Sequence, residues 1–255
     1  MIDRFDTIIL SSECGVATIT LNRPASRNAL NAQMCTEFAD ALAIAAKDEE
    51  VRLILIRGAG VSFCAGADLK ERQGMQHAEV VARRMSAFHL YRAIEDCEKP
   101  VIAVVHGAAA GSGLEIAAAC DFIVATPDVQ FWTPEAQWGS VGATQRLPKI
   151  VGKRLAKELM FTGRRMNAQE ALNVGLVNRV VPMERLNDEL SSISEKIAKA
   201  PALAIRLAKS CIDRNMENSA KAALSEEISA IEENLRRSNW KQAIETFGAK
   251  NASIS

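Results

Sequence analysis

The sequence predicts an α/β fold with an all-helical C-terminal part, and three patterns support this. Strand and helix patterns alternate through about the first 185 of the 255 residues. One stretch, KPVIAVVHG at residues 99–107, is continuously apolar, which is typical of a strand covered on both faces. From about residue 185 onward the apolar residues have only helical spacing.

The first third of the chain supplies strands and one clear helix. Residues 7–24 (TIILSSECGVATITLNRP) predict two strands around a turn at 12–15. A helix within residues 28–48, capped by Asn28 or Asn31, follows. Its apolar face holds Met34, Phe38, Leu42 and Ala45. Residues 51–58 predict another strand, and the polar stretch at 72–86 is expected to be a mobile loop that leads into a helix ending near residue 95.

The remaining elements follow the same logic. A helix is expected directly after the strand at 99–107, and residues 122–134 (FIVATPDVQFWTP) predict two short strands. Short helices end at Gly163, and residues 168–182 form a helix and a strand. We therefore expect a core with the functional site at residues 1–185 and a helical module at 186–255.

Composition excludes several classes of protein. Lys+Arg and Asp+Glu are both 31, so a broad basic surface for nucleic acid is absent. No apolar stretch is long enough to span a membrane, and the N-terminal residues MIDRFDTIIL do not form a signal peptide. The six scattered cysteines indicate reduced thiols in the cytoplasm, and the three histidines lack metal-ligand spacing, so no metal is expected.

Two segments combine a strand, a glycine-containing bend and a helix start: SFCAGADLKE at 62–71 and HGAAAGSGLE at 106–115. The first amides of a helix have no acceptor inside it and carry partial positive charge. Amides from two such bends can converge on one oxygen, as in an oxyanion hole. Close packing alone also explains each bend.

Two other interpretations of the glycines are unfavourable. The pair Gly111 and Gly113 lacks the third glycine of a dinucleotide fingerprint, and no P-loop lysine follows. A serine nucleophile in G-x-S-x-G would need glycine at Ala110. Phosphate binding and serine hydrolysis are therefore not expected.

Two acidic residues stand in apolar segments. Glu115 lies at an apolar helix start, and Glu135 lies in the sequence between Trp132 and Trp138. Apolar surroundings raise the pKa of a carboxyl group, which suits a proton donor. A glutamate favoured by the helix dipole, or one in a salt bridge, remains an alternative for each. Together, beside the two bends, they indicate acid/base chemistry next to a carbonyl group.

These segments resemble the enoyl-CoA hydratase/isomerase (crotonase) superfamily over nearly the whole chain. The motifs that carry the resemblance are LNRPASRNAL (21–30), FCAGADLKE (63–71), KPVIAVVHGAAAGSGLEIAAACD (99–121), FWTPEAQWGSVGATQRLPKIVG (131–152) and TGRRMNAQEALNVGLVNRVVP (162–182). The resemblance implies a spiral of ββα units followed by a helical trimerisation region that closes the active site. It also implies a homotrimer or a dimer of trimers.

The resemblance implies a hydro-lyase that adds water to, or removes it from, the 2,3 bond of an enoyl-CoA. Backbone amides of Ala67 and Ser112 would hold the thioester oxygen, Glu115 would deprotonate water, and Glu135 would protonate C2. The implied partner is the acyl-CoA substrate, and no cofactor is implied beyond its coenzyme A. Substrate-binding positions implied in the same way are Arg23, Ala25, Ala65, Asp68, Leu69, Lys70, Trp138, Phe247 and Lys250.

Departures from the family pattern leave the substrate and the chemistry open. The loop GSVGATQRL at 139–147 is shorter than in many members, and Trp132 and Trp138 stand where smaller residues are common. A branched, hydroxylated, cyclic or otherwise unusual acyl group is therefore as compatible as a plain short chain. A double-bond isomerase using one glutamate, and a non-catalytic acyl-CoA-binding protein, are the alternative functions.

Overall fold

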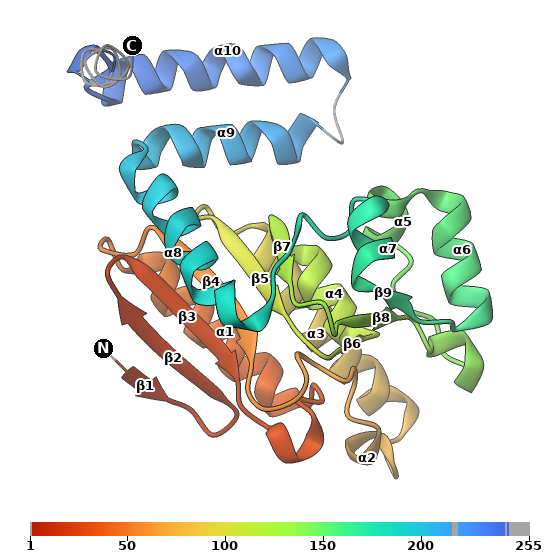
Figure 1. Cartoon of the computed structure of the whole chain (residues 1–255). Helices are drawn as coiled ribbons and strands as arrows, with labels where there is room; N and C mark the ends of the chain where they lie inside the picture. Colours follow the sequence, from red (N-terminus) through yellow and green to blue (C-terminus); the bar gives the residue numbers. More distant parts are fainter. Residues whose placement is uncertain (1, 216–218, 243, 245–255) are drawn as a thin grey trace.

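A computed structural model describes residues 2–215, 219–242 and 244, and Figure 1 gives the arrangement of the elements. The elements in chain order are β1 (Ile2–Arg4), β2 (Ile8–Glu13), β3 (Val16–Leu21), η1 (Pro24–Ser26), α1 (Ala32–Lys47), β4 (Leu53–Gly58), α2 (Leu69–Arg72), α3 (His77–Glu95), β5 (Val101–Val105), β6 (Ala108–Ala110), α4 (Ser112–Ala119), β7 (Phe122–Ala125), β8 (Gln130–Trp132), η2 (Glu135–Trp138), α5 (Arg146–Val151), α6 (Lys153–Thr162), β9 (Met166–Asn167), α7 (Ala168–Asn173), β10 (Arg179–Val180), α8 (Met183–Lys199), α9 (Ala202–Asn215) and α10 (Ala220–Arg237).

The larger sheet has the strand order β1-β2-β3-β4-β5-β7-β10. Its first two pairings are antiparallel, and the pairings from β3 through β10 are parallel. The helices α1, α3 and α4 make the connections between the parallel strands. The carboxyl ends of β4 and β5 therefore lie at the same edge, where ligands bind in open α/β sheets.

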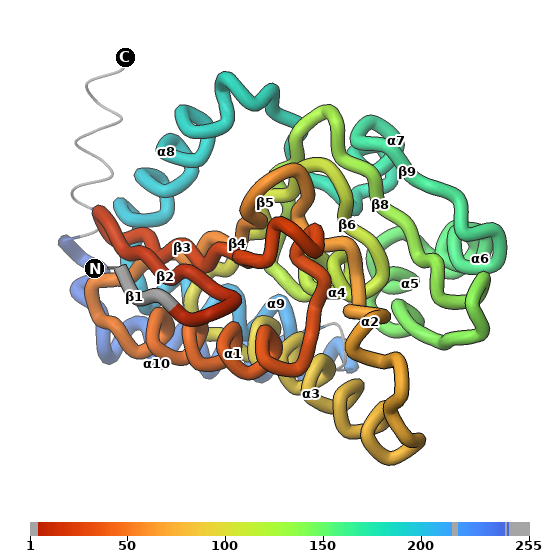
Figure 2. The backbone as a smooth tube through the Cα atoms, turned by 90° about the horizontal axis from the view of Figure 1, so that it is seen from below, coloured from red at the N-terminus to blue at the C-terminus, as the bar shows by residue number. Residues whose placement is uncertain are grey.

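Alternate residues of the central strands enter two separate cores. Ile54 and Ile56 of β4 belong to the core shared with α1, α3 and α4. Leu53 and Leu55 pack instead with Leu186 of α8 and its apolar neighbours. Figure 2 shows α8 on one side of the sheet and α1 and α3 on the other. This two-sided cover explains why the predicted strand at 99–107 has no polar face.

A smaller sheet of β6, β8 and β9 stands beside the first. An isolated bridge between Cys64 and Ala109 joins its edge to the segment that follows β4. The Cys64 amide donates to the Ala108 carbonyl at 2.9 Å, and the Cys64 carbonyl accepts from the Ala110 amide at 3.0 Å. The two glycine-containing bends are therefore fixed next to each other.

Helix boundaries follow local capping. Asn31, one of the two predicted caps, begins α1 by accepting from the Met34 amide at 2.9 Å. The expectation of a mobile loop over 72–86 is wrong from His77 onward, because α3 begins there. The Glu79 carboxylate accepts from the Gln76 amide at 2.6 Å and stabilises this polar helix start. The short strand β6 was also not predicted.

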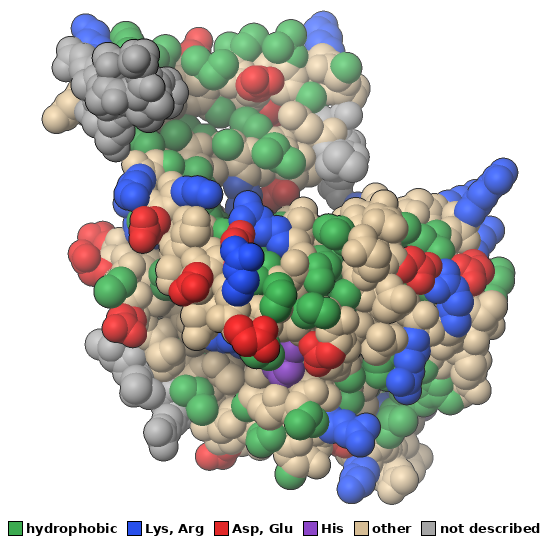
Figure 3. Space-filling view, viewed as in Figure 1, with side chains coloured by type: hydrophobic (Ala, Val, Ile, Leu, Met, Phe, Trp, Pro, Cys, Tyr) green, Lys and Arg blue, Asp and Glu red, His purple; other side chains and the backbone are tan. Residues whose placement is uncertain are grey.

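The last three helices differ in what they cover. The helix α8 begins at Met183 and packs on the sheet, so the domain boundary at 185/186 stays a prediction. The helices α9 and α10 pack on each other and stand off the core (Figure 1). Figure 3 shows apolar side chains gathered along them. Ile228 and Ile231 of α10 are about half exposed. Within the described residues, no helix is long and apolar enough to cross a membrane.

Candidate active site

A cavity of about 310 Å³ opens where the two glycine-containing bends meet. Its walls come from the segments 65–69 and 111–115, from η2 with the loop after it, and from α3. Among the residues expected at the site, the lining includes Ala65, Ala67, Leu69, Ser112, Glu115, Glu135 and Trp138. The structure thus brings together residues from Ala65 to Trp138, which are far apart in the sequence.

Ala67 and Ser112 line this cavity from two loops. Neither N–H has a hydrogen-bond acceptor among the described residues. The loops are in close contact, because a Cβ added at Gly66 would lie 3.0 Å from the Ala110 carbonyl oxygen. Gly66 has φ +102° and Gly111 has φ +47°, backbone conformations that L side chains rarely adopt. The two free donors therefore lie on adjacent rigid turns.

The carboxylate of Glu115 is buried in the first turn of α4 and is 6 % exposed. Its Oε2 accepts from Nη1 of Arg146 at 3.2 Å, whereas its Oε1 is buried without a hydrogen-bond partner among the described residues. Burial raises the pKa of Glu115 above its ordinary value; Arg146 opposes this rise, and Glu135 adds to it. The salt-bridge alternative considered for Glu115 is thus present, and one oxygen remains unpaired.

Arg146, at the start of α5, contacts Glu95 and Tyr91 as well as Glu115. Its Nε and Nη2 donate to the two carboxylate oxygens of Glu95 at 2.7 and 2.8 Å. Its guanidinium carbon also lies 5.2 Å from the ring centroid of Tyr91. A bidentate pair combined with ring stacking fixes an arginine in one orientation. The contacts with Glu95 and Tyr91 therefore fix the guanidinium of Arg146 that donates to Glu115.

Glu135 is the first residue of η2 and is 7 % exposed. Burial raises the pKa of Glu135, and no cation touches its carboxyl group among the described residues, although Arg84 acts on it from a distance. Its Oε2 is buried without a partner, and a Cβ added at Gly142 would lie 3.0 Å from its Cγ. Glycines at 111 and 142 leave the space that this side chain occupies.

The aromatic neighbours of Glu135 divide between two environments. Trp138 lines the cavity. Trp132 is not part of the cavity lining; its ring lies against the guanidinium of Arg165, at 4.6 Å from the ring centroid. The pKa of Glu135 is raised, as expected from its apolar surroundings, and burial is the cause.

Other predicted binding residues either form structural contacts or are exposed outside the cavity. The carboxylate of Asp68 caps α2 and pairs with Arg23 at 2.8 Å. Burial opposes ionisation of Asp68, but the Arg23 hydrogen bond and the α2 amides outweigh it and lower its pKa. Ala25 and Lys70 are exposed, and none of these four residues lines the cavity. Their contact with coenzyme A stays a prediction, and Phe247 and Lys250 lie outside the described residues.

Sequence reasoning missed the charged residues around the two glutamates. Arg146 lies in one of the motifs that carry the resemblance, and its place in TQRL after the second glutamate is a usable signal. Arg72 and Arg84 line the cavity, and Tyr91 lies beside the Ser112 side chain. Arg72 and Arg84 fall in the stretch expected to be a loop, and Tyr91 falls in the helix expected after it.

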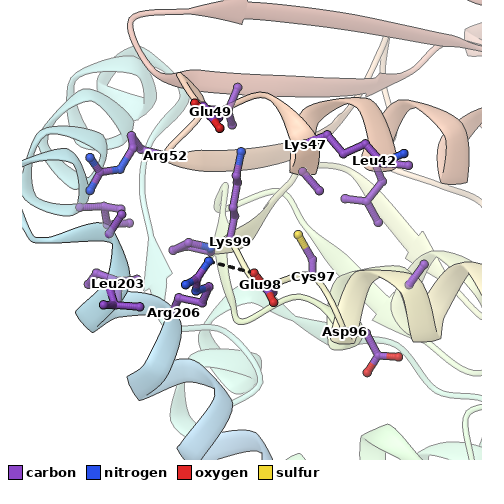
Figure 4. A pocket seen from close by; sticks show the side chains of 18 of the residues that line it. Leu42, Lys47, Glu49, Arg52, Asp96, Cys97, Glu98, Lys99, Leu203 and Arg206 are labelled. Atoms are coloured by element: carbon purple, nitrogen blue, oxygen red, sulfur yellow. Dashed lines mark hydrogen bonds and ion pairs between the residues drawn. The ribbon is translucent and has the colours of Figure 1, made fainter. Parts of the chain in front are cut away.

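A larger cavity of about 750 Å³ lies between α1 and α9 (Figure 4). Its charges are largely satisfied inside the protein: Arg206 pairs with Glu98 at 3.2 Å, and Arg52 donates to the Ala200 carbonyl at 2.7 Å. Lys99 donates to two backbone carbonyls of the α1 end. Its lining contains neither of the two glycine-containing bends. We therefore place the candidate active site in the smaller cavity.

The smaller cavity has the parts that acid/base chemistry beside a carbonyl needs. Two amides can hold one carbonyl oxygen and the negative charge that develops on it. Two buried carboxyl groups with unpaired oxygens can exchange protons with groups bound between them. Within the described residues, no cluster of three metal-binding side chains is present.

Known proteins share this sequence and fold. The family model described as "Enoyl-CoA hydratase/isomerase" matches residues 11–253. A crotonyl-CoA hydratase of Syntrophomonas wolfei is 40% identical over 233 residues, which is 89% of each chain. A short-chain-enoyl-CoA hydratase of Clostridium acetobutylicum is 37% identical over 246 residues, covering 95% of this chain and 94% of that one.

Solved structures agree with the sequence comparisons. A crystal structure of an enoyl-CoA hydratase from Bacillus anthracis superimposes with a TM-score of 0.92 at 34% identity, covering 96% of this chain and 97% of that one. The expected crotonase fold is thereby confirmed. With its family model, relatives and fold in agreement, the chain belongs to the enoyl-CoA hydratase/isomerase family.

Proposed function

We propose that this protein hydrates the 2,3 double bond of enoyl-CoA thioesters, or dehydrates the products, by two-glutamate catalysis. One observation carries the mechanism. The unpaired oxygens of two buried glutamates, Glu115 and Glu135, lie in one cavity with the free amides of Ala67 and Ser112. The relatives named as hydratases support the same reaction.

The amides act on the thioester carbonyl. When water adds to C3, negative charge moves onto the thioester oxygen as an enolate forms. The N–H groups of Ala67 and Ser112 stabilise this charge more strongly than they bind the neutral carbonyl, so they lower the barrier. Removing one such donor usually costs about a hundredfold or more in rate.

The glutamates divide the proton transfers. Glu115 has Arg146 in contact, which favours its ionised form, so it accepts the proton of the attacking water. Glu135 has no cation in contact among the described residues, and burial favours its protonated form, so it delivers a proton to C2. The water oxygen bonds to C3, the π electrons move toward C2, and the enolate takes the proton from Glu135. No cofactor is needed beyond the coenzyme A of the substrate.

The test measures loss of the conjugated enoyl-thioester absorbance with a panel of 2-enoyl-CoA substrates. Wild type should react, and E115Q and E135Q should each lose about two to four orders of magnitude in kcat. E158Q, which changes an exposed glutamate of α6, serves as the matched control. Unchanged turnover in either active-site variant would refute the proposed roles.

Labelled water separates the alternatives. Hydration places solvent oxygen in the product, whereas double-bond isomerisation does not. A protein that binds enoyl-CoA without changing either absorbance or label would be the non-catalytic acyl-CoA-binding alternative.

Coenzyme A contact at Arg23, Ala25, Lys70 and the other predicted rim positions is tested separately by the KM of their alanine variants.

We also propose a homotrimer or a dimer of trimers, assembled through the C-terminal helices, which would also help to close the active site. The support is the run of half-exposed apolar residues on α9 and α10, which is larger than scattered surface apolar residues require. Light scattering should give three or six chains per particle, and I228D/I231D should lower that number.

We also propose a cytoplasmic location, which agrees with six free cysteines.

A further inference from the structure

Three arginines line the candidate active-site cavity from α2 and α3, and they differ in their partners. Arg83 is buried, pairs with Glu71 at 3.2 Å and donates to the Leu30 carbonyl. Arg72 and Arg84 form no ion pair within the described residues. Two half-buried guanidinium groups therefore border a ligand cavity without a carboxylate partner.

The contacts of these two arginines hold them at the cavity without neutralising them. The guanidinium carbon of Arg72 lies 5.8 Å from the ring centroid of Trp138. Nη2 of Arg84 lies 3.2 Å from the Ser140 hydroxyl oxygen and donates to the Val141 carbonyl. Arg72 thus contacts the end of η2, and Arg84 contacts the loop after it, which is shorter than in many members. The two side chains are thus held at the wall of the cavity formed by α2, α3 and the segment after Glu135.

Among the described residues, neither active-site glutamate forms an ion pair with Arg72 or Arg84. Glu115 is already paired with Arg146, and Glu135 is influenced by Arg84 only from a distance. A substrate with a purely apolar acyl chain would leave both arginines unpaired beside it. A substrate anion would supply the missing partner, and the arginines would offset its repulsion from the two glutamates.

We propose that Arg72 and Arg84 form a subsite for a carboxylate at the far end of the acyl chain. Its ligands are 2-enoyl-CoA thioesters of dicarboxylic acids. Leu69, Val80 and Phe88 supply apolar wall for the methylene groups between the double bond and that carboxylate. The inference rests on the proposed function for its reaction, and on the unpaired guanidinium groups for its specificity.

The decisive comparison uses two substrates of equal chain length. 2-Hexenoyl-CoA and 2-hexenedioyl-CoA differ in the terminal group, a methyl in one and a carboxylate in the other. The ratio of their kcat/KM values cancels any general effect of an arginine on Glu135 or on coenzyme A. Wild type should prefer the diacid thioester by about tenfold or more, as expected for a charge-assisted, bidentate contact.

Variants assign the preference to these residues. R84Q and R72Q should each lower the ratio about tenfold, and R84K should retain part of it because it keeps the charge. R92Q removes a guanidinium from the same helix, at a site where it pairs with Asp96 outside the cavity, and should leave the ratio unchanged. Equal losses on both substrates would overturn the proposal, since they would place the arginines on a phosphate of coenzyme A. A wild-type ratio below one would also overturn it.

A binding measurement separates this subsite from the proposed reaction. Calorimetry compares hexanoyl-CoA with adipyl-CoA, which are saturated and cannot be hydrated. Tighter binding of adipyl-CoA that R84Q abolishes, in a protein that hydrates no thioester, would retain the subsite and refute the function. Hydration of enoyl-CoA with no discrimination between the two saturated ligands would retain the function and refute the subsite.

Discussion

Replacing Arg146 by glutamine removes the one cation in contact with Glu115 among the described residues. Under the proposed mechanism, Glu115 must be ionised to accept a proton from water. Burial raises the pKa of Glu115, and Arg146 is the contact that opposes this rise. In R146Q the pKa therefore rises further, because burial and the charge of Glu95 remain. We expect the low-pH limb of the kcat profile to move to higher pH.

The structure sets the scale of the effect. Unit charges 3.2 Å apart attract by about 5 kcal/mol at an effective dielectric constant of about 20. Glu95 shares the same guanidinium, and water can enter beside the smaller glutamine, so a part of this attraction is lost. We expect kcat at pH 7 to fall by about ten- to hundredfold, or ~1.4–2.7 kcal/mol.

The assay is the full pH profile of kcat for wild type, R146Q, R146K and the double variant R146Q/E95Q. R146K should lie between wild type and R146Q, because lysine keeps the charge without the bidentate geometry. The double variant should recover part of the shift, because removing Glu95 removes a negative charge left unpaired. The matched control is R164Q, since Arg164 also bridges two carboxylates, Glu158 and Glu170, outside the cavity.

A purely structural role for Arg146 gives a different result. Misplacement of α5 would lower kcat by the same factor at every pH, with the low-pH limb unmoved. That outcome in a variant with an unchanged melting temperature would refute the electrostatic reasoning. An R164Q profile displaced like that of R146Q would refute it as well.

Three further predictions concern the surroundings of the glutamates. G111A should lower kcat at least tenfold, because its Cβ would meet the Glu135 carboxyl group and its φ is +47°; kinetics with a parallel melting curve checks this. N28A should lower the free energy of unfolding by about 2–4 kcal/mol in urea titrations, because the buried amide nitrogen of Asn28 donates to the Ala59 and Ser62 carbonyls at 2.9 and 2.8 Å. E135Q should raise the melting temperature at pH 8 and change it less at pH 4: burial raises the folded pKa of Glu135, so its ionised form destabilises the fold above the unfolded pKa.

The sequence was sufficient wherever a short-range pattern carries the physical signal. Continuous apolar character in 101–105 predicts a strand between two layers, and the structure divides its residues between two cores. The cap at Asn31 and the helix end at Gly163 follow from side-chain and backbone chemistry within four residues. Both bends and both glutamates were found in this way, because each lies beside a strand that the pattern locates.

Contacts between distant segments could not be predicted from short-range sequence patterns. Arg146 meets Glu115 across 31 positions and Glu95 across 51, and no local pattern relates them. The start of α3 was missed because its first turns are polar, and polar residues at a helix surface are indistinguishable from a loop by composition. Arg84 consequently fell in a predicted loop, although the helix is what directs it to the cavity.

The proposed division of labour between the glutamates rests on one asymmetry in their surroundings. Both are buried, and burial favours the protonated form of each. Arg146 offsets that burial for Glu115 alone by direct contact, and its own orientation is fixed by Glu95. One base and one acid can therefore coexist at neutral pH in the same cavity. Because the proposed arrangement depends on Arg146 at the start of α5, we expect the loop that joins η2 to α5 to affect the acid/base chemistry as well as the shape of the acyl site.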